Sequence, residues 1–171
     1  PLEGTNFAAK NEPGALSVIA VANKSNLFNA PETYMDKISA DVKENDVVDL
    51  DFSVKKNIHN LAQYKNKRPE NLTVCILDRP RHKKIIDELN NLNVKIKLIT
   101  DGDISGALLV TNEKYNVDLF IGIGGGPEGV LAATALDAFD CFFQGKFIFE
   151  TEKDRIRANN MGIKDFNKKY N

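Results

Sequence analysis

The stretch that decides the fold reads VDLFIGIGGGPEG and occupies residues 117–129. Its first seven residues, 117–123, are mostly apolar and branched, which predicts a buried strand. Four glycines in five positions (122–126) leave backbone N–H groups bare, and Pro127 suits the first turn of a helix that we expect to end near Phe139. A strand that leads through glycines into a helix is typical of α/β proteins.

The same alternation of strand and helix covers the chain on the N-terminal side of this stretch. Ser53 suits the cap of one helix, Pro80 the first turn of a second and Asp103 the cap of a third. We therefore expect, in order, helix 53–64, strand 71–77, helix 80–91, strand 94–99 and helix 103–110. With the strand and helix around the glycines, this order predicts a parallel α/β sheet.

The two ends of the chain differ from this middle part. Residues 15–22 are small, apolar and β-branched, which predicts a buried strand. Residues 23–26 then read as a turn into a short returning strand at 27–28. Phenylalanines on both sides of residues 144–146 predict a second hairpin.

The composition narrows the class of protein. Of the 171 residues, 42% are hydrophobic and the formal net charge is −1, so we expect a globular domain without a general attraction to nucleic acid or to an anionic membrane. No apolar stretch reaches the ~18–20 residues that a membrane-spanning helix needs. Cys75 and Cys141 both lie in apolar runs, which predicts two buried free thiols in a reducing cytosol.

Three loops follow the predicted strands, at residues 78–82, 100–103 and 124–129. The carboxyl ends of parallel strands meet at one edge of a sheet, and ligands of α/β proteins bind beyond that edge. We therefore expect the three loops to converge on one site.

The first loop carries two arginines, Arg79 and Arg81, on either side of Pro80 at a predicted helix start. Two guanidinium groups beside free backbone N–H groups make a good seat for a phosphate. The alternative is a pair of solvated surface arginines, and the sequence favours neither. His82 follows at once, and a single histidine at a helix start is more often a surface residue than a catalyst.

The other two loops are acidic. Asp101 and Asp103 could chelate a metal or accept hydrogen bonds from sugar hydroxyls, although an ordinary turn with Asp103 as helix cap is favoured. The glycine loop lacks the Lys-Ser/Thr pair of a Walker A loop and departs from the dinucleotide fingerprint. Glu128 makes better sense as a metal ligand than beside a pyrophosphate, with a helix cap as the alternative.

Five separated motifs resemble those of class II fructose-1,6-bisphosphatases, some of which also hydrolyse sedoheptulose 1,7-bisphosphate. The motifs are PLEGT (1–5), NAPETYM (29–35), RPRH (79–82), DGD (101–103) and GIGGGPEGV (122–130), in the family's order and spacing. The similarity runs from the first residue to about Ala138 and weakens after Phe139.

The resemblance implies the layered α/β/α/β/α fold of the lithium-sensitive, metal-dependent sugar phosphatases. Within it, residues 1–50 would be the remainder of an N-terminal α+β metal-binding half. Residues 51–171 would be the C-terminal, parallel α/β substrate-binding half.

The resemblance also implies a function and a role for each motif residue. The reaction would be hydrolysis of the 1-phosphate of fructose 1,6-bisphosphate to fructose 6-phosphate, a phosphoric monoester hydrolysis of gluconeogenesis in the cytoplasm. Glu3 and Glu128 would bind a divalent cation, Mg²⁺ or Mn²⁺, and Thr5 would orient and activate the attacking water. The implied substrate-binding residues are Glu3, Gly4, Thr5, Tyr34, Arg79, Pro80, Arg81, Asp101, Gly102, Asp103 and Gly125.

Two departures from the family's pattern matter for activity. The family has an aspartate immediately before the position of Pro1 and further acidic ligands upstream, so this chain is expected to be an N-terminally truncated piece with part of the metal cluster. Arg79 also stands where the family usually has lysine. We expect the parent protein to be a phosphatase and this chain alone to be poorly active or inactive.

Two other readings remain open from the sequence. One is an inositol or other sugar phosphatase of the same superfamily. The paired arginines argue against it, because a monophosphate needs no second anion-binding site. The other is a sugar-phosphate-binding module without turnover, against which the acidic residues Glu3 and Glu128 count. The expected partner is a small-molecule sugar bisphosphate, with no nucleic acid and no membrane, and self-association into a homo-oligomer stays open.

Overall fold

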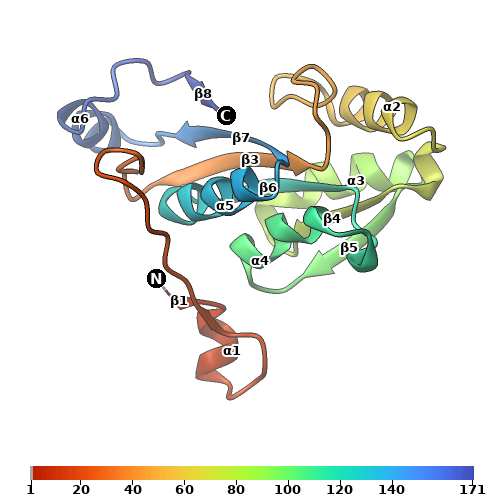
Figure 1. Cartoon of the computed structure of the whole chain (residues 1–171), viewed down its shortest axis with the longest axis horizontal. Coiled ribbons are helices and arrows are strands. Elements are labelled where there is room, and N and C mark those ends of the chain that lie inside the picture. Colours follow the sequence, from red (N-terminus) through yellow and green to blue (C-terminus); the bar gives the residue numbers. More distant parts are fainter. Residues whose placement is uncertain (1) are drawn as a thin grey trace.

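The computed structural model describes residues 2–171 and contains a six-stranded sheet and a separate two-stranded ribbon (Figure 1). The strand order in the large sheet is β5-β4-β6-β3-β7-β8, and the ribbon pairs β1 with β2. The strands are β1 (Leu2–Glu3), β2 (Leu16–Ser17), β3 (Tyr34–Ala40), β4 (Thr73–Leu77), β5 (Lys95–Ile99), β6 (Leu119–Gly125), β7 (Phe142–Ile148) and β8 (Lys169–Tyr170).

Helices cover both faces of the large sheet. The α-helices are α1 (Thr5–Ala9), α2 (Val54–Tyr64), α3 (Lys83–Asn91), α4 (Asp103–Leu108), α5 (Gly126–Ala138) and α6 (Glu152–Asn160). Short 3-10 turns are η1 (Pro69–Asn71), η2 (Pro80–His82), η3 (Leu109–Thr111) and η4 (Glu113–Tyr115). Figure 1 shows α4 and α5 on one face, α2 and α3 on the other, and α1 with β1 projecting below the body.

The core therefore has two parts, one on each face. Ile38 of β3 packs with Ile58 and Leu61 of α2 and Leu89 of α3. On the opposite face Phe120 of β6 belongs to the cluster that includes Ile104 and Ala107 of α4 and Ala132 and Leu136 of α5. Residues on both faces of a central strand are buried in this arrangement, which explains the continuous apolar runs that predicted strands.

The predicted parallel sheet is correct for three strands and incomplete for the rest. β4 runs parallel to β5 and to β6, as the alternation of strands and helices indicated. β3 runs antiparallel to both β6 and β7, and β8 runs antiparallel to β7, so the sheet is mixed. No strand was predicted at β3, because Asp36 and Lys37 interrupt its apolar run.

The predicted N-terminal hairpin is wrong. Of residues 15–22 only Leu16 and Ser17 form a strand, which pairs with β1. Ile19 and Val21 are 83% and 82% exposed, and within residues 2–171 the chain from 18 to 28 contributes no strand to either sheet. Apolar, branched residues form a strand only where a neighbouring strand satisfies their backbone groups, and the described residues supply none here.

The predicted hairpin at 144–146 is also wrong. β7 runs through this segment as one strand, and Gly145 lies opposite Lys37 of β3 in the ladder. A Cβ on Gly145 would lie 2.6 Å from Sδ of Met35, so this glycine allows close packing rather than a turn. The helix α6 and the edge strand β8 were not predicted.

The predicted helices form, with adjusted starts. Ser53 caps α2, because its hydroxyl accepts a hydrogen bond from the backbone N–H of Lys56 at 3.2 Å. The helix expected from Pro80 begins as the 3-10 turn η2 and becomes α-helical at Lys83. Asp103 does not cap α4: Gly102 takes the N-cap position with a φ of 93°, which glycine adopts without strain.

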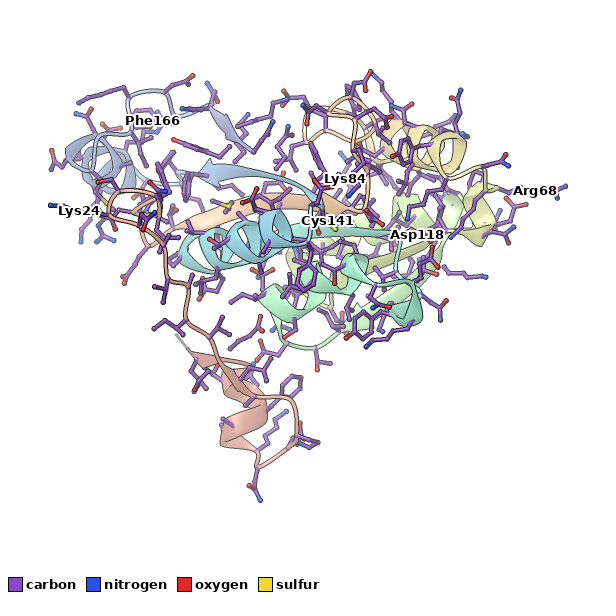
Figure 2. All side chains as sticks on the ribbon, viewed as in Figure 1. Lys24, Arg68, Lys84, Asp118, Cys141 and Phe166 are labelled. Atoms are coloured by element: carbon purple, nitrogen blue, oxygen red, sulfur yellow. The ribbon has the colours of Figure 1, made fainter. Side chains whose placement is uncertain are left out.

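At the end of β6 opposite its glycines, Asp118 ties two strands together. Its carboxylate accepts hydrogen bonds from Nζ of Lys67 at 2.8 Å and from the backbone N–H of Thr73 at 2.9 Å. Figure 2 shows Asp118 and Arg68 near the end of the molecule that lies away from Lys24 and Phe166. Burial raises the pKa of the Asp118 carboxyl, but these hydrogen bonds outweigh it and lower the pKa below its ordinary value.

Three other expectations concern the chain as a whole. Cys75 is a buried free thiol as predicted, and burial raises its pKa to about 12, whereas the free thiol of Cys141 is only partly buried.

Within residues 2–171, no helix combines the length and apolar character needed to cross a membrane. The division at residue 50 stays a prediction; β3, which precedes it, lies in the same sheet as strands that follow it.

Candidate functional site

The three loops converge on one cavity of about 230 Å³ at the carboxyl ends of β4, β5 and β6. Its walls combine the predicted loops with the segment that enters α1. The lining residues are Leu2, Glu3, Gly4, Thr5, Tyr34, Leu77, Arg79, Arg81, Asp101, Asp103, Gly124, Gly125 and Glu128. Of the residues predicted for the site, only Pro80 and Gly102 are not among them.

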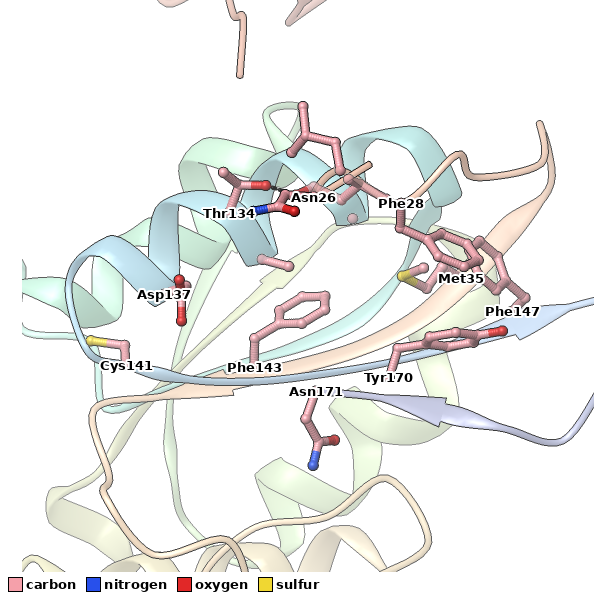
Figure 3. A pocket seen from close by; sticks show the side chains of 14 residues that line it. Asn26, Phe28, Met35, Thr134, Asp137, Cys141, Phe143, Phe147, Tyr170 and Asn171 are labelled. Carbon is pink, nitrogen blue, oxygen red and sulfur yellow. Dashed lines mark hydrogen bonds between the residues drawn. The ribbon is translucent and has the colours of Figure 1, made fainter. Parts of the chain in front are cut away.

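A second cavity, of about 400 Å³, lies between α5, β7 and β8 and the segment at Phe28 (Figure 3). Its walls are mainly apolar, and Phe147 and Tyr170 lie edge to face with ring centroids 5.5 Å apart. It shares no lining residue with the predicted site, so it is not where the predicted chemistry would occur.

The two arginines reach the cavity from the turn after β4. Arg81 donates hydrogen bonds from Nε and Nη2 to the backbone carbonyl oxygen of Ile123, at 3.0 and 2.8 Å. Its guanidinium carbon also lies 5.0 Å from the ring centroid of Tyr34. Arg79 donates from Nη1 to the carbonyl oxygen of Asp78 at 3.0 Å. These contacts use part of each guanidinium and leave further N–H donors for an anion.

His82 is buried, which corrects its expected place on the surface. Its Nε2 accepts a hydrogen bond from the backbone N–H of Ile123 at 2.8 Å, so Nδ1 carries the proton and donates to the carbonyl oxygen of Leu77 at 2.7 Å. Burial lowers the pKa of His82. The neutral ring therefore fixes the turn that carries Arg79 and Arg81 against β6. No sequence signal distinguished this buried histidine from a surface histidine.

The acidic loop after β5 is held at both of its aspartates. The Asp101 carboxylate accepts hydrogen bonds from Nδ2 of Asn6 at 3.0 Å and from the backbone N–H of Gly102 at 2.9 Å. Asp103 forms an ion pair with Nζ of Lys37. Lys37 was missed, because no strand was predicted at β3 and no sequence signal marked this lysine as buried.

Glu3 closes the cavity from the N-terminal side by binding the start of α4. Its carboxylate accepts hydrogen bonds from the backbone N–H groups of Ile104 and Ser105 and from Oγ of Ser105, the last at 2.5 Å. This contact satisfies free N–H groups at the start of a helix, where a negative charge is favourable. Thr5, the first residue of α1, lies beside it in the cavity wall.

Comparison with known proteins identifies the family of the chain. The family model described as bacterial fructose-1,6-bisphosphatase, glpX-encoded, matches residues 1–171. The chain belongs to this family.

Relatives named D-fructose 1,6-bisphosphatase class 2/sedoheptulose 1,7-bisphosphatase resemble the chain along its length. The protein from Synechocystis sp. is 36% identical over 183 residues, which cover 100% of this chain and 53% of that protein. The protein from Trichodesmium erythraeum is 35% identical with the same coverage, and the one from Microcystis aeruginosa is 38% identical over 89% of this chain and 44% of its own length. The chain thus spans about half the length of these relatives.

The residues predicted to bind a divalent cation in this family do not form a complete metal site here. The hydrogen bonds from Ile104 and Ser105 already occupy both oxygens of Glu3. Glu128, in the first turn of α5, lines the same cavity. Among residues 2–171, no group of three or more His, Cys, Asp or Glu side chains could hold a metal ion. The roles of Glu3 and Glu128 as ligands stay predictions.

Proposed function

We propose that this chain carries the substrate-binding part of a fructose-1,6-bisphosphatase. The reaction is the attack of water on the phosphorus of the 1-phosphate, with cleavage of the bond to the sugar oxygen, to give fructose 6-phosphate and inorganic phosphate. The observation that carries the proposal is the wall of the 230 Å³ cavity, where Arg79 and Arg81 face a set of carboxylates in a chain of this family. A bisphosphate needs cations for its two anions, and a sugar needs acceptors for its hydroxyls.

Each part of the cavity suits one part of the substrate. The guanidinium groups of Arg79 and Arg81 suit the phosphate that stays on the sugar. Asp101 and Asp103, which line the cavity, would accept hydrogen bonds from the sugar hydroxyls, and Tyr34 lies beside Arg81. Thr5, Glu3 and Glu128 lie in the same wall and would serve the phosphate that is cleaved. Thr5 is proposed to orient the attacking water.

Dependence on Mg²⁺ or Mn²⁺ belongs to the proposal, because acidic residues beside a phosphate site are the ligands such cations prefer. When bound, a divalent cation would stabilise negative charge on the phosphoryl oxygens. The two carboxylates assigned to the cation, Glu3 and Glu128, belong to no group of three or more His, Cys, Asp or Glu side chains among residues 2–171 that could hold a metal ion. We therefore expect the 171-residue chain to bind the substrate and to hydrolyse it slowly or not at all.

The proposal includes a location and a pathway. The enzyme would act in the cytoplasm, in gluconeogenesis, on a small sugar bisphosphate. The net charge of −1 gives the chain no general attraction to nucleic acid or to an anionic membrane. The division of the chain at residue 50 into a metal-binding and a substrate-binding half is part of this proposal, and self-association stays open.

A sugar-phosphate-binding module without turnover is the second candidate. It is favoured by one observation, the full use of the Glu3 carboxylate in hydrogen bonds to α4. The two candidates differ in a longer protein that includes the remaining metal ligands: Glu128→Ala would abolish phosphate release by an enzyme and leave the affinity of a binding module nearly unchanged.

The substrate class is tested by comparing three ligands. Calorimetric titration of the chain with fructose 1,6-bisphosphate, fructose 6-phosphate and inositol 1-phosphate gives a dissociation constant for each. We expect the bisphosphate to bind at least about tenfold more tightly than either monophosphate, because its second phosphate also forms hydrogen bonds with charged groups of the cavity. Equal affinities for all three ligands would contradict the assignment to a bisphosphate.

A further inference from the structure

A fully buried lysine lies directly behind the cavity. Lys37, in the middle of β3, is 1% exposed. Its partners in the ladder are Gly122 of β6 and Gly145 of β7, so no side chain lies directly opposite it on either adjacent strand. A Cβ on Gly129 of α5 would lie 3.5 Å from Cδ of Lys37, which shows how closely the helix covers the aliphatic part of the side chain. Three glycines thus leave room for one long cation across the face of the sheet.

The ammonium group of Lys37 joins two parts of the predicted site. Nζ forms an ion pair with Oδ2 of Asp103, in the first turn of α4, and donates to the backbone carbonyl oxygen of Gly125, at the end of β6, at 2.8 Å. Both partners line the cavity, whereas Lys37 itself does not. Lys37 therefore acts on the cavity only through these two groups.

The stability of the folded chain alone does not explain this ion pair. A buried ammonium loses its hydration, and the gain from a buried partner repays that loss only with good geometry and further hydrogen bonds. An apolar side chain of similar shape would fill the same space without this cost. The ion pair has a clearer use if the position and charge of Asp103 matter to a ligand.

The second oxygen of Asp103 supports such a use. Among the described residues, Oδ1 of Asp103 is the one buried side-chain oxygen or nitrogen atom without a hydrogen-bond partner. Buried acceptors are nearly always satisfied, so an unpaired one on a residue that lines the cavity is unusual, and a small turn of the Asp103 side chain toward the cavity would let it accept from a bound ligand. A sugar hydroxyl is a suitable donor.

We infer that Lys37 is a positioning residue that holds Asp103 and the Gly125 carbonyl for the sugar of the ligand, while its positive charge offsets the Asp103 carboxylate near the phosphates. The inference rests on the proposed function, since it assigns a sugar phosphate to the cavity. It separates two tasks: the arginines bind the anion, and the Lys37–Asp103 pair orients the acceptor for the hydroxyls.

The test uses two ligands and a matched control. Lys37→Met removes the charge and keeps the length of the side chain, and Lys67→Met breaks a more exposed Lys–Asp pair, with Asp118, at the other end of β6. The dissociation constants of fructose 1,6-bisphosphate and of inorganic phosphate are measured by calorimetry for both variants and the unchanged chain. We expect Lys37→Met to weaken the sugar bisphosphate at least about tenfold and inorganic phosphate less than about threefold, because the arginines remain.

The outcomes separate the inference from the proposed function. Loss of affinity by the same factor for both ligands indicates general damage and overturns the inference, as does an unchanged affinity for the sugar bisphosphate. We expect Lys67→Met to bind both ligands as the unchanged chain does. Failure of the unchanged, folded chain to bind any sugar bisphosphate overturns the proposed function, and with it the inference.

A second variant covers the case in which Lys37→Met does not fold. Lys37→Met/Asp103→Asn removes both charges and keeps both shapes, so no buried charge is left unpaired. We expect it to fold and to bind fructose 1,6-bisphosphate as weakly as Asp103→Asn alone. A double variant that binds the sugar bisphosphate like the unchanged chain would overturn the inference.

Discussion

Arg81 holds the end of β6 by donating two hydrogen bonds, from Nε at 3.0 Å and from Nη2 at 2.8 Å, to the single carbonyl oxygen of Ile123. The contact fixes the guanidinium at the mouth of the glycine loop, beside the ring of Tyr34. A residue that is proposed to bind a phosphate while it also binds the protein in this way needs several donors in a rigid plane, which arginine has and lysine lacks.

We therefore expect Arg81→Lys to weaken the binding of fructose 1,6-bisphosphate by about tenfold although the charge is kept. The control is Arg68→Lys, because Arg68 is 82% exposed and lies outside the cavity. Calorimetry on both variants checks the prediction. Equal affinities of the two variants would show that the planar donor set of Arg81 is not used.

The glycines at the end of β6 should differ in their tolerance of a methyl group. A Cβ on Gly124 would lie 2.2 Å from Oδ2 of Asp103, and a Cβ on Gly125 would lie 1.8 Å from Oε2 of Glu128. Lys37 holds Asp103 in place, whereas the end of Glu128 can turn away about its side-chain torsions.

Gly124→Ala is accordingly expected to lower the free energy of unfolding by about 1–3 kcal/mol, and Gly125→Ala by less than about 1 kcal/mol. Urea denaturation of the two variants measures the difference. The reverse order of the two losses would mean that the ion pair does not fix Asp103.

The burial of His82 predicts a dependence of stability on pH. Burial lowers the pKa of His82, so below the ordinary histidine pKa of about 6.5 the unfolded state binds the proton more readily than the folded state does. The contribution of His82 is complete above that value and is lost as the pH falls below it. The protonated ring can no longer accept the hydrogen bond from Ile123.

His82→Gln should remove this part of the pH dependence. The other histidine, His59, is exposed, so His59→Gln is the matched control and is expected to keep it. The free energy of unfolding of both variants is compared at about pH 7.5 and about pH 5.5. A drop of the same size in both variants would contradict the prediction.

Asp36 makes a contribution of the opposite sign. Burial raises its pKa to about 6, against smaller lowering effects of the Lys37 backbone N–H and of the Lys146 charge. The folded state therefore keeps this proton to a higher pH than the unfolded state does, and the associated stability is lost as the pH rises from about 4 to about 6.

At neutral pH the charged Asp36 is thus a cost, and Asp36→Asn should raise the free energy of unfolding by about 1–2 kcal/mol. Asp87→Asn, at an exposed position of α3, is the control and should change stability by less than about 0.5 kcal/mol. A destabilised Asp36→Asn at neutral pH would show that the carboxylate has a favourable partner.

Much of the sheet could be predicted from the sequence because its local signals agree. Ser53 before an amphipathic stretch, the apolar runs of β4 and β6, and the apolar residues that alternate with lysines in β5 each point to one structure. The loops at the carboxyl ends of these strands then had to meet, so the position of the cavity followed from topology.

The missed features depend on contacts between distant segments. β3 is buried although Lys37 lies in it, because Asp103, 66 residues away, neutralises the charge. His82 is buried because a backbone N–H of β6, 41 residues away, donates to its ring. The apolar residues 18–22 fail to form a strand because the described chain supplies no partner for them. None of these outcomes can be read from residue type and spacing.

The measurement that tests the account most directly is a calorimetric titration of the 171-residue chain with fructose 1,6-bisphosphate, beside the variant Arg79→Ala/Arg81→Ala. Circular dichroism shows that both proteins are folded. The account predicts that the unchanged chain binds the sugar bisphosphate and that the variant binds it at least about tenfold more weakly. A folded chain that does not bind the ligand, or a variant that binds it equally well, would contradict the central claim that this cavity is a sugar-bisphosphate site.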